Sequence, residues 1–440
     1  MNMMGPEIAA PTSEKRAHAY RNYVLLLLAL GQTFSYVDRQ LVAVLLTPIK
    51  TELRLSDTQL GFLSGLAFAL FYAVCGIPLA RVADRRSRRN LMGIALLLWS
   101  AITTLGGLVQ NFAQLLLVRF GVGIGEAGYA PAAFSMISDY FPPARRQLAA
   151  GLMNAGPPVG IMLGLVIGCL VAPAHGWRAA FLVAGIPGLL FAMLFVCTVR
   201  EPVRGQSDAP AQHDMVQPPF LASLATLWRN RSYRYVTLTT VLEGFSMFAL
   251  STWMPSFFER SHHLPLSTIG PSLGLAVICG ALGSVLGGMF GDRLARIDVR
   301  WPLYMASIGM IAGIPLVLMT LFLANPGAAI LCYGLFYFAL ALAYGPQFAL
   351  CTATVPLRLR ALALSVLMFA SAVIAFGLGP LATGMASDAL TPALGAEALR
   401  AAMAIASLSL IVPAILGCVA AACLNKDLIA RRREAIDTTN

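Results

Sequence analysis

Residues 20–50 read YRNYVLLLLALGQTFSYVDRQLVAVLLTPIK, an apolar run that is interrupted near its centre by Asp38 and Arg39. A second apolar run, residues 115–138 (LLLVRFGVGIGEAGYAPAAFSMIS), carries Glu126 about halfway along its length. An ionisable side chain at the centre of a bilayer costs at least about 2.5–3.5 kcal/mol, so such groups face a bundle interior or an aqueous cavity and pair with one another. These three residues therefore indicate a pathway through a membrane.

Apolar runs of this length recur along the whole chain. The 440 residues are 58% hydrophobic and only 12% charged, whereas soluble domains average about 25% charged residues. Because about 20 apolar residues cross a bilayer as a helix, we expect an all-α integral membrane protein. The sequence predicts twelve spans, at 22–49, 57–80, 90–110, 113–138, 147–172, 177–199, 233–258, 266–290, 299–324, 326–351, 360–386 and 397–424.

The basic residues are distributed unevenly between the two sides of this expected membrane. If the N-terminus is cytoplasmic and each span reverses the side, 24 of the 31 Lys and Arg residues lie inside. Lys50, Arg54, Arg178, Arg260 and Arg400 lie outside, and Arg39 and Arg119 lie within spans. This asymmetry is the positive-inside signature, and it predicts that both termini are cytoplasmic. The net charge of +11 is therefore explained by topology, and no nucleic-acid partner is expected.

A hydrophilic interruption divides the chain into two similar halves. Residues 200–232 are rich in Pro, Gly, Gln and charged residues and read as a linker with six spans on each side. Within it, Phe220, Leu221, Leu224, Leu227 and Trp228 recur at helical spacing, which predicts an interfacial helix. The expected organisation is an arm at 1–21, a six-helix bundle at 22–199, the linker, a second bundle at 233–424 and a tail at 425–440.

The two halves share a loop motif. ARVADRRSRRN, with Asp84 and Arg85, follows the second span, and GGMFGDRLAR, with Asp292 and Arg293, follows the eighth, which is the corresponding place in the second half. Two Asp-Arg pairs at matching positions, both flanked by basic residues, are much more specific than one. Many secondary transporters are built from such repeats, with a binding site between the halves near the midplane.

These motifs resemble those of the major facilitator superfamily over essentially the full chain. Residues 80–89 match its loop motif, although Ala80 and Ser87 stand where glycine is usual. Arg119, Gly123 and Gly125 match the R-x-x-x-G-x-G pattern of its fourth helix. Residues 156–160, GPPVG, resemble a fifth-helix pattern associated with antiporters, and glycines of this kind also serve close helix packing.

A narrower resemblance is to the spinster family, whose animal members export sphingolipid signals or move lysophospholipids. It rests on residues 36–39 (YVDR), 123–127 (GIGEA), 139–142 (DYFP) and 200–205 (REPVRG), and the short loops are those of a bacterial member. The resemblance implies two six-helix bundles, with the first, fourth, seventh and tenth helices lining a central cavity. It also implies a lipid-like or amphiphilic substrate.

Asp38, Arg39 and Glu126 are the candidate proton-coupling group. Burial raises the pKa of a carboxyl group and a nearby arginine lowers it, so opening and closing a cavity can load and release a proton. Arginine stays charged, so Arg39 is a fixed partner for Asp38, for Glu126 or for an anionic headgroup. The alternative is a buried ion pair that only fixes helix register.

A second set of residues is expected to contact substrate. Gln32, Ser35, Tyr36 and Arg39 recur at helical spacing and form one polar stripe on the first span. The seventh and tenth spans add Glu243 and Tyr344, where Glu243 could instead bond a neighbouring backbone or hydroxyl group. The expected substrate-binding residues are Gln32, Tyr36, Arg39, Tyr129, Glu243 and Tyr344.

The repeated loop motif is expected to act as a cytoplasmic gate that holds this face closed in the outward-open state. Each exposed ion pair contributes only roughly 0–1 kcal/mol, but a network of pairs can bias an equilibrium between two conformations. The expected gate residues are Asp84, Arg85, Arg88, Arg89, Asp139, Arg145, Asp292 and Arg293.

The sequence therefore predicts a secondary transporter that works by alternating access, coupled to protons, in a bacterial inner membrane. A lipid-like substrate is favoured, a proton antiporter for drugs or small metabolites is the alternative, and a passive channel is less favoured. An enzyme is not expected, because no catalytic dyad or phosphate loop appears. The eight cysteines and five histidines show no metal-ligand spacing, so no cofactor besides the coupling proton is expected. We expect a monomer surrounded by membrane lipids.

Overall fold

The computed structural model describes residues 11–204, 220–342, 344–356 and 359–437, which are almost entirely helical. Six spans make up the N-terminal half, and helix breaks divide four of them into shorter helices. They are α1 (Pro11–Val44) with α2 (Leu46–Leu53); α3 (Asp57–Gly61), the π-helical η1 (Phe62–Leu66) and α4 (Ala67–Arg85); α5 (Arg88–Gly106); α6 (Phe112–Glu126) with α7 (Tyr129–Tyr140); α8 (Pro143–Met153) with α9 (Gly156–His175); and α10 (Trp177–Thr198).

The C-terminal half repeats this plan. It is preceded by the short helix α11 (Phe220–Arg229), which lies where the sequence predicts a helix in the linker. Its spans are α12 (Arg231–Ser261); α13 (Leu266–Ile297); α14 (Trp301–Phe322); α15 (Pro326–Ala341) with α16 (Tyr344–Ala353); α17 (Arg360–Ala370), the π-helical η3 (Ser371–Leu378) and α18 (Gly379–Leu394), followed by the 3₁₀ turn η4 (Gly395–Glu397); and α19 (Ala398–Leu408) with α20 (Ile411–Asp437). The predicted all-α architecture of twelve spans in two bundles is confirmed.

The expected segment boundaries differ from the structure at three places. Helix α1 begins at Pro11, so half of the predicted N-terminal arm is helical, and α20 continues to Asp437 through most of the predicted tail. Polar residues continue both helices beyond the apolar run, which a search for apolar runs does not detect. Residues 200–204 of the predicted linker bind the N-terminal half, and residues 205–219 lie outside the described part of the chain.

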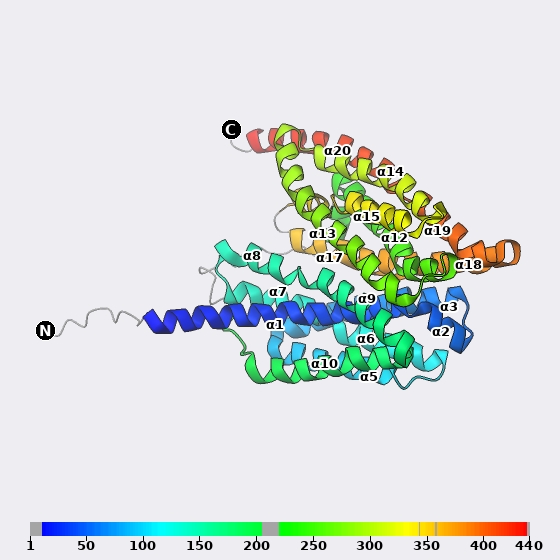
Figure 1. Ribbon diagram of the computed structural model, residues 1–440. Coiled ribbons are helices and arrows are strands. Elements are labelled where there is room, and N and C mark those ends of the chain that lie inside the picture. Colours follow the sequence, from blue (N-terminus) through cyan, green and yellow to red (C-terminus); the bar gives the residue numbers. More distant parts are fainter. Residues whose placement is uncertain (1–10, 205–219, 343, 357–358, 438–440) are drawn as a thin grey trace.

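The two halves lie side by side and meet at one end. In Figure 1, α1 begins and α20 ends toward the left, whereas α2, α3 and α18 lie at the right. We call these two sides the termini face and the far face. The halves are joined toward the far face by contacts of α3 with α18, η1 with η3 and α9 with α13, and they diverge toward the termini face (Figure 1).

The outer surface of the molecule is strongly apolar. Seven helical runs of the described chain are long and apolar enough to cross a membrane by themselves. Large side chains such as Leu117 and Leu190 are 67% and 64% exposed. Contiguous apolar surface of this kind marks contact with lipid. The structure is therefore that of an integral membrane protein.

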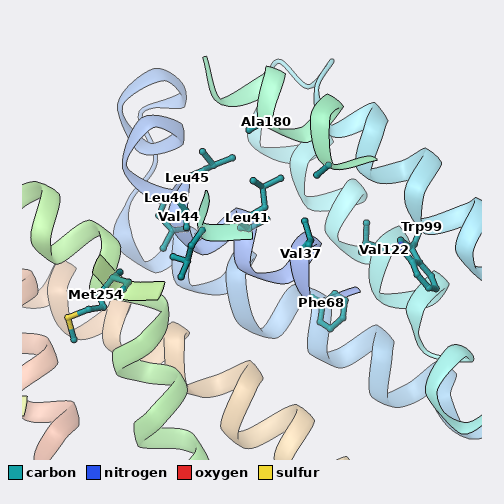
Figure 2. Close-up of a cluster of buried hydrophobic side chains, with 14 of the residues drawn as sticks. Val37, Leu41, Val44, Leu45, Leu46, Phe68, Trp99, Val122, Ala180 and Met254 are labelled. Atoms are coloured by element: carbon teal, nitrogen blue, oxygen red, sulfur yellow. The ribbon is translucent and has the colours of Figure 1, made fainter. Parts of the chain in front are cut away.

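Close packing holds the pathway helix α1 in place. Figure 2 shows Val37, Leu41 and Val44 of α1 within a cluster of buried apolar side chains that other helices complete. On the α9 side, a side-chain carbon added at Gly156 would lie 2.6 Å from the carbonyl oxygen of Ala29. Gly160 is equally tight against Thr33. The glycines of the GPPVG pattern therefore let the α1 and α9 backbones touch, as small residues do between membrane helices.

Candidate functional site

Glu126 is the centre of the buried polar group between α1 and α6. Its Oε2 accepts hydrogen bonds from Arg39 Nε at 2.9 Å, Arg39 Nη2 at 2.7 Å and Ser35 Oγ at 2.5 Å. Its Oε1 is also buried but accepts no hydrogen bond from the described residues. Glu126 thus has one oxygen that is bound by Arg39 and Ser35 and a second oxygen that is available to a proton.

Asp38 points away from this ion pair, although it precedes Arg39 in the chain. Consecutive helix residues are about 100° apart, and Asp38 Oδ2 accepts a hydrogen bond from Thr103 Oγ1 of α5 at 3.0 Å. Asp38 is only 6% exposed. Of the partners expected for Arg39, the structure therefore selects Glu126, and Asp38 is a second buried carboxyl group bound by a hydroxyl.

Arg119, the arginine of the fourth-helix motif, is the second buried cation of this half. It is 1% exposed, and its Nε donates to the carbonyl oxygen of Leu63 at 3.2 Å. Leu63 lies in the π-helical η1, where the local widening of a helix changes which carbonyl groups are bonded within it. Gly123 and Gly125 of the same motif face the Phe68 carbonyl and Trp99, so added side chains would separate α6 from α4 and α5.

Aromatic rings surround the guanidinium group of Arg39. Its central carbon lies 4.6 Å from the ring centre of Phe68, 4.8 Å from Tyr72, 4.9 Å from Tyr36 and 5.9 Å from Phe376. Phe376 belongs to η3 and so to the C-terminal half. Stacking of this kind stabilises a cation over ring faces. Arg39 is thus held at the junction of the two halves, and its side chain is 16% exposed.

The other expected substrate-binding residues have different surroundings. Gln32 is half-buried on α1 beside Gly156. The Tyr129 hydroxyl donates to the Leu28 carbonyl at 3.0 Å in a position that is 1% exposed, so it is engaged in packing. Glu243 is buried within the C-terminal half and accepts a hydrogen bond from Gln347 at 2.6 Å. The side chain of Tyr344 lies outside the described part of the structure.

The far face contains an ionic cluster that joins the halves, which we call the Asp57 lock (Lys50, Asp57, Arg260, Ser387 and Asp388). Arg260 Nη1 of α12 donates to both Asp57 oxygens at 3.0 and 3.1 Å, and Lys50 Nζ donates to Oδ1 at 2.7 Å. Ser387 Oγ donates to Oδ2 at 2.7 Å. Asp57 is 2% exposed.

Asp388 completes the lock through the backbone. Its carboxylate oxygens accept from the amide groups of Asp57 at 3.0 Å and Thr58 at 2.7 Å. These amides begin α3, so a carboxylate of the C-terminal half caps a helix of the N-terminal half. Sequence reasoning missed this cluster. The predicted topology places Asp57, Arg260 and Lys50 at the ends of spans on the same side of the membrane. It does not show that the three side chains come together.

Residues 28–380 match the family model described as Major Facilitator Superfamily. The chain belongs to this superfamily. An MFS-type efflux pump of Mycolicibacterium smegmatis is 35% identical over 439 residues, which cover 98% of this chain and 100% of that protein. Protein spinster of Drosophila melanogaster is 27% identical over 332 residues, or 73% of this chain and 54% of that protein.

Solved structures show the same likeness. A bacterial homologue of the human lysosomal transporter spinster, in an inward-facing and unoccupied conformation, has a TM-score of 0.85 at 29% identity and covers 93% of this chain and 98% of that one. Its inward-facing and occupied structure has a TM-score of 0.82. The expected family, a superfamily transporter resembling spinster, is confirmed. Transporters of this superfamily are not enzymes.

The superfamily loop motif forms a compact cluster at the termini face of the N-terminal half. Arg88 is 2% exposed and binds Asp139 at 2.5 Å and Glu201 at 2.9 Å. Arg89 donates its backbone amide to Glu201 at 2.7 Å and its side chain to the Val196 carbonyl. The expected association of the loop arginines with Asp139 is present, and Glu201 is a partner that was not assigned to the gate.

The start of the linker clamps the same loop. Arg204 donates to the carbonyl oxygens of Ala83, Asp84 and Arg86 at the end of α4. A cation is favourable at a helix C-terminus, just as the Glu201 carboxylate is at the N-terminus of α5. Burial by itself raises the pKa of Glu201, but the hydrogen bonds from the Arg89 amide, Arg88 and Ser87 outweigh burial and lower this pKa below its ordinary value.

Within the described part of the chain, no hydrogen bond or ion pair joins the remaining expected gate residues to the opposite half. The side chains of Asp84, Arg85, Asp292 and Arg293 are exposed at the termini face. Arg145 is exposed too, and its Nη1 lies 3.4 Å from His18 Nε2. The halves diverge at this face and are joined by the Asp57 lock at the far face.

Proposed function

We propose that this protein is a proton-coupled secondary transporter that works by alternating access and moves a lipid-like or amphiphilic molecule of the lysophospholipid or sphingolipid class. The observation that supports coupling best is the geometry of Glu126. Its Oε2 is bound three times by Arg39 and Ser35, while the buried Oε1 has no donor among the described residues.

Proton binding and the position of Arg39 are linked by this geometry. When Glu126 is ionised, it holds the Arg39 guanidinium with two charge-assisted hydrogen bonds, which are about twice as strong as neutral ones. A proton on Oε1 removes the charge and weakens both bonds. Arg39 can then turn toward a ligand in the cavity. Asp38, buried beside Thr103, supplies a second site where a proton changes the charge balance of the same region.

The substrate class is supported by the surroundings of Arg39. Arg39 Nη1 has no acceptor among the described residues, so it is the nitrogen available to an anionic oxygen of a headgroup. The rings of Tyr36, Phe68, Tyr72 and Phe376 offer apolar surface beside it. A related zebrafish protein carries the name sphingosine-1-phosphate transporter. An amphiphile with an anionic headgroup and an apolar tail would match both the available nitrogen of Arg39 and the surrounding rings.

The alternative is a proton antiporter for drugs or small metabolites. It is favoured by the Mycolicibacterium smegmatis efflux pump, which matches over nearly the full chain. Both candidates share the same coupling group and differ only in the substrate. A passive channel is less favoured, because the Asp57 lock joins the two halves at the far face while they diverge at the termini face.

We place the protein in a bacterial inner membrane with the termini face in the cytoplasm, since the basic loops gather there. The conformation described is then inward-open, with the far face closed. We propose that it acts as a monomer surrounded by membrane lipids. We propose no cofactor besides the proton.

The test is flux in proteoliposomes with and without an imposed pH gradient. A panel of lysophospholipids, sphingoid bases and cationic dyes covers both candidate substrate classes. We expect the gradient to drive transport by the wild type, and we expect Asp38→Asn and Glu126→Gln to abolish this drive while leaving the protein folded. Asp298→Asn is the matched control, because Asp298 pairs with Arg300 in a loop outside the spans. Flux that ignores the gradient would reject proton coupling.

A further inference from the structure

A row of polar side chains lies inside the C-terminal half, away from the group around Glu126. Thr239, Glu243 and Ser246 are four and three residues apart and share one face of α12, and they are 0%, 2% and 0% exposed. Ser246 Oγ lies 2.6 Å from Ser409 Oγ, between α19 and α20. Thr239 faces Gly417 of α20. This face therefore points into the bundle.

Glu243 is the ionisable member of this row, and it has no positive partner. Its Oε2 accepts a hydrogen bond from Gln347 Nε2 at 2.6 Å, and its buried Oε1 has no donor among the described residues. No Lys, Arg or His in the described chain forms an ion pair with it. Glu243 is thus a buried carboxyl group bound by one neutral amide.

The groups that contact Glu243 and its neighbours on this face are uncharged. Gln347 of α16 binds Glu243 itself, and Ser409, between α19 and α20, lies against Ser246. Ala375 of η3 lies against Gly244, and Ser307 of α14 faces Gly417 as Thr239 does. On α12 itself the nearest charged residues toward each end are Arg234 and Glu259, about 13 Å and 24 Å along the axis.

The two halves differ in their buried charge balance. In the group around Glu126 in the N-terminal half, the two carboxyl groups of Asp38 and Glu126 are accompanied by two arginines, Arg39 and Arg119. In the C-terminal half, Glu243 has no positively charged partner among the described residues. An isolated ionised carboxylate in an apolar interior is so unfavourable that the group takes up a proton instead.

We propose that Glu243 is a second proton-binding site of this transporter, located in the C-terminal bundle and independent of the Asp38–Glu126 group. The inference rests on the proposed proton-coupled function. In the conformation described, Oε1 carries the proton and Oε2 accepts from Gln347. The proton comes from water and returns to water, and no other bond changes.

Exchange of this proton requires that water reach Glu243 in another conformation. Movement of α12, which carries Glu243, or of α16, which carries Gln347, would open such a path. Helix α12 carries both Glu243 and Arg260, so release of Arg260 from Asp57 frees the outer end of the helix that holds the carboxyl group. Gln347 lies in α16, so the hydrogen-bonding partner of Glu243 belongs to a different helix from the one that carries Arg260.

The direct test is difference infrared spectroscopy on the full-length protein in lipid, which detects the carbonyl band of protonated carboxyl groups. The background variant is Asp38→Asn with Glu126→Gln, which removes the carboxyl groups of the other site. At neutral pH we expect this double variant to retain a protonated-carboxyl band, and adding Glu243→Gln to remove it. Adding Glu397→Gln instead should leave the band, because Glu397 is an exposed carboxylate paired with Arg400.

Two results would overturn the assignment at this stage. One is the lack of a protonated-carboxyl band in the double variant at neutral pH. The other is loss of the band when sodium chloride replaces choline chloride at constant pH, because a sodium ion would then be the cation that Glu243 binds. The infrared measurement needs no transport, so it can succeed even if the pH-gradient flux that tests the proposed function fails.

A second measurement tests whether the proton is exchanged during transport. The ratio of protons to substrate is measured in proteoliposomes for the wild type and for Glu243→Gln. We expect the variant to move one proton fewer per substrate while the Asp38–Glu126 group still couples. If the infrared band is assigned to Glu243 but the proton-to-substrate ratio is unchanged, Glu243 stays protonated throughout transport. That result would overturn the proposal that its proton is exchanged. Ser246→Ala, a neutral change on the same face, should leave the ratio unchanged.

Discussion

Arg260 of α12 reaches across the junction between the halves and binds both carboxylate oxygens of Asp57, at 3.0 and 3.1 Å. The pair is partly shielded, since the side chain of Asp57 is 3% exposed and that of Arg260 is 19% exposed. Lys50 and Ser387 bind the same carboxylate. One acidic side chain therefore receives donors from both halves, and its charge holds the far face closed.

We expect Asp57→Asn to open the far face. The amide keeps the shape but loses the charge that Arg260 and Lys50 share, and removing one partner of a shielded ion pair is strongly unfavourable. A loss of only about 1.4 kcal/mol changes the ratio of closed to open molecules tenfold. Distances between spin labels on the far ends of α2 and α12 should lengthen. Glu52→Gln is the control, since Glu52 binds Arg178 within one half, and equal distributions in the two variants would argue against the lock.

We expect Asp84→Asn to act at the opposite face and in the opposite direction. Asp84 is exposed here, as a gate residue should be when the gate is open, so its charge can only matter in the conformation that closes the termini face. The variant should reduce the outward-open population, and Asp292→Asn should do so less, because fewer basic residues follow it. Spin-label distances between α4 and α17 under conditions that populate the outward-open state measure this, and unchanged distances would contradict a gating role for Asp84.

We expect Arg39→Lys to separate headgroup binding from proton coupling. Lysine keeps the positive charge but loses the planar group that pairs with a carboxylate or phosphate through two nitrogens and that stacks on rings. Binding of an anionic amphiphile should weaken by roughly tenfold or more, whereas that of a neutral amphiphile with the same tail should change little. Both affinities and proton uptake are measured on one preparation. Equal losses for the two amphiphiles would limit Arg39 to pairing with Glu126.

The clamp between the linker and the loop motif should weaken in acid. The pKa of Glu201 is lower in the folded protein than its ordinary value, so its contribution to stability is complete above about pH 4.3, the ordinary pKa of Glu. That contribution is lost as the pH falls through the lower folded pKa. The melting temperature of the wild type should exceed that of Glu201→Gln at neutral pH, and the two should converge in acid. A difference that stays constant down to about pH 3 would show that the charge of Glu201 is not involved.

The sequence predicted those features of the fold that insertion into a membrane constrains. Apolar length and the position of arginines predict the spans, because a bilayer demands both. The importance of Glu126 was visible for the same reason. Its choice of partner was not, because Asp38 and Arg39 are adjacent in sequence and only the packing of α1 against α5 and α6 decides which of them Glu126 meets.

Other features depend on contacts that no local pattern carries. Asp57 and Arg260 are 203 residues apart and pair only because the two halves close. Leu63 of the π-helical turn η1 accepts a hydrogen bond from Arg119 of another helix, and apolar periodicity predicts neither the turn nor the bond. Tyr129 was among the expected substrate-binding residues, and its hydroxyl binds the Leu28 backbone.

The cap that Asp388 places on α3 has a consequence for measuring this protein without labels. The amides of Asp57 and Thr58 find their acceptors on the other half of the molecule, so parting of the halves at the far face exposes the first turn of α3 to solvent. Amide hydrogens exchange with deuterium when such bonds open. The deuterium uptake of these two neighbouring peptide groups should therefore rise and fall with the fraction of molecules open to the far side, and native, unmodified chains can report their own conformational equilibrium.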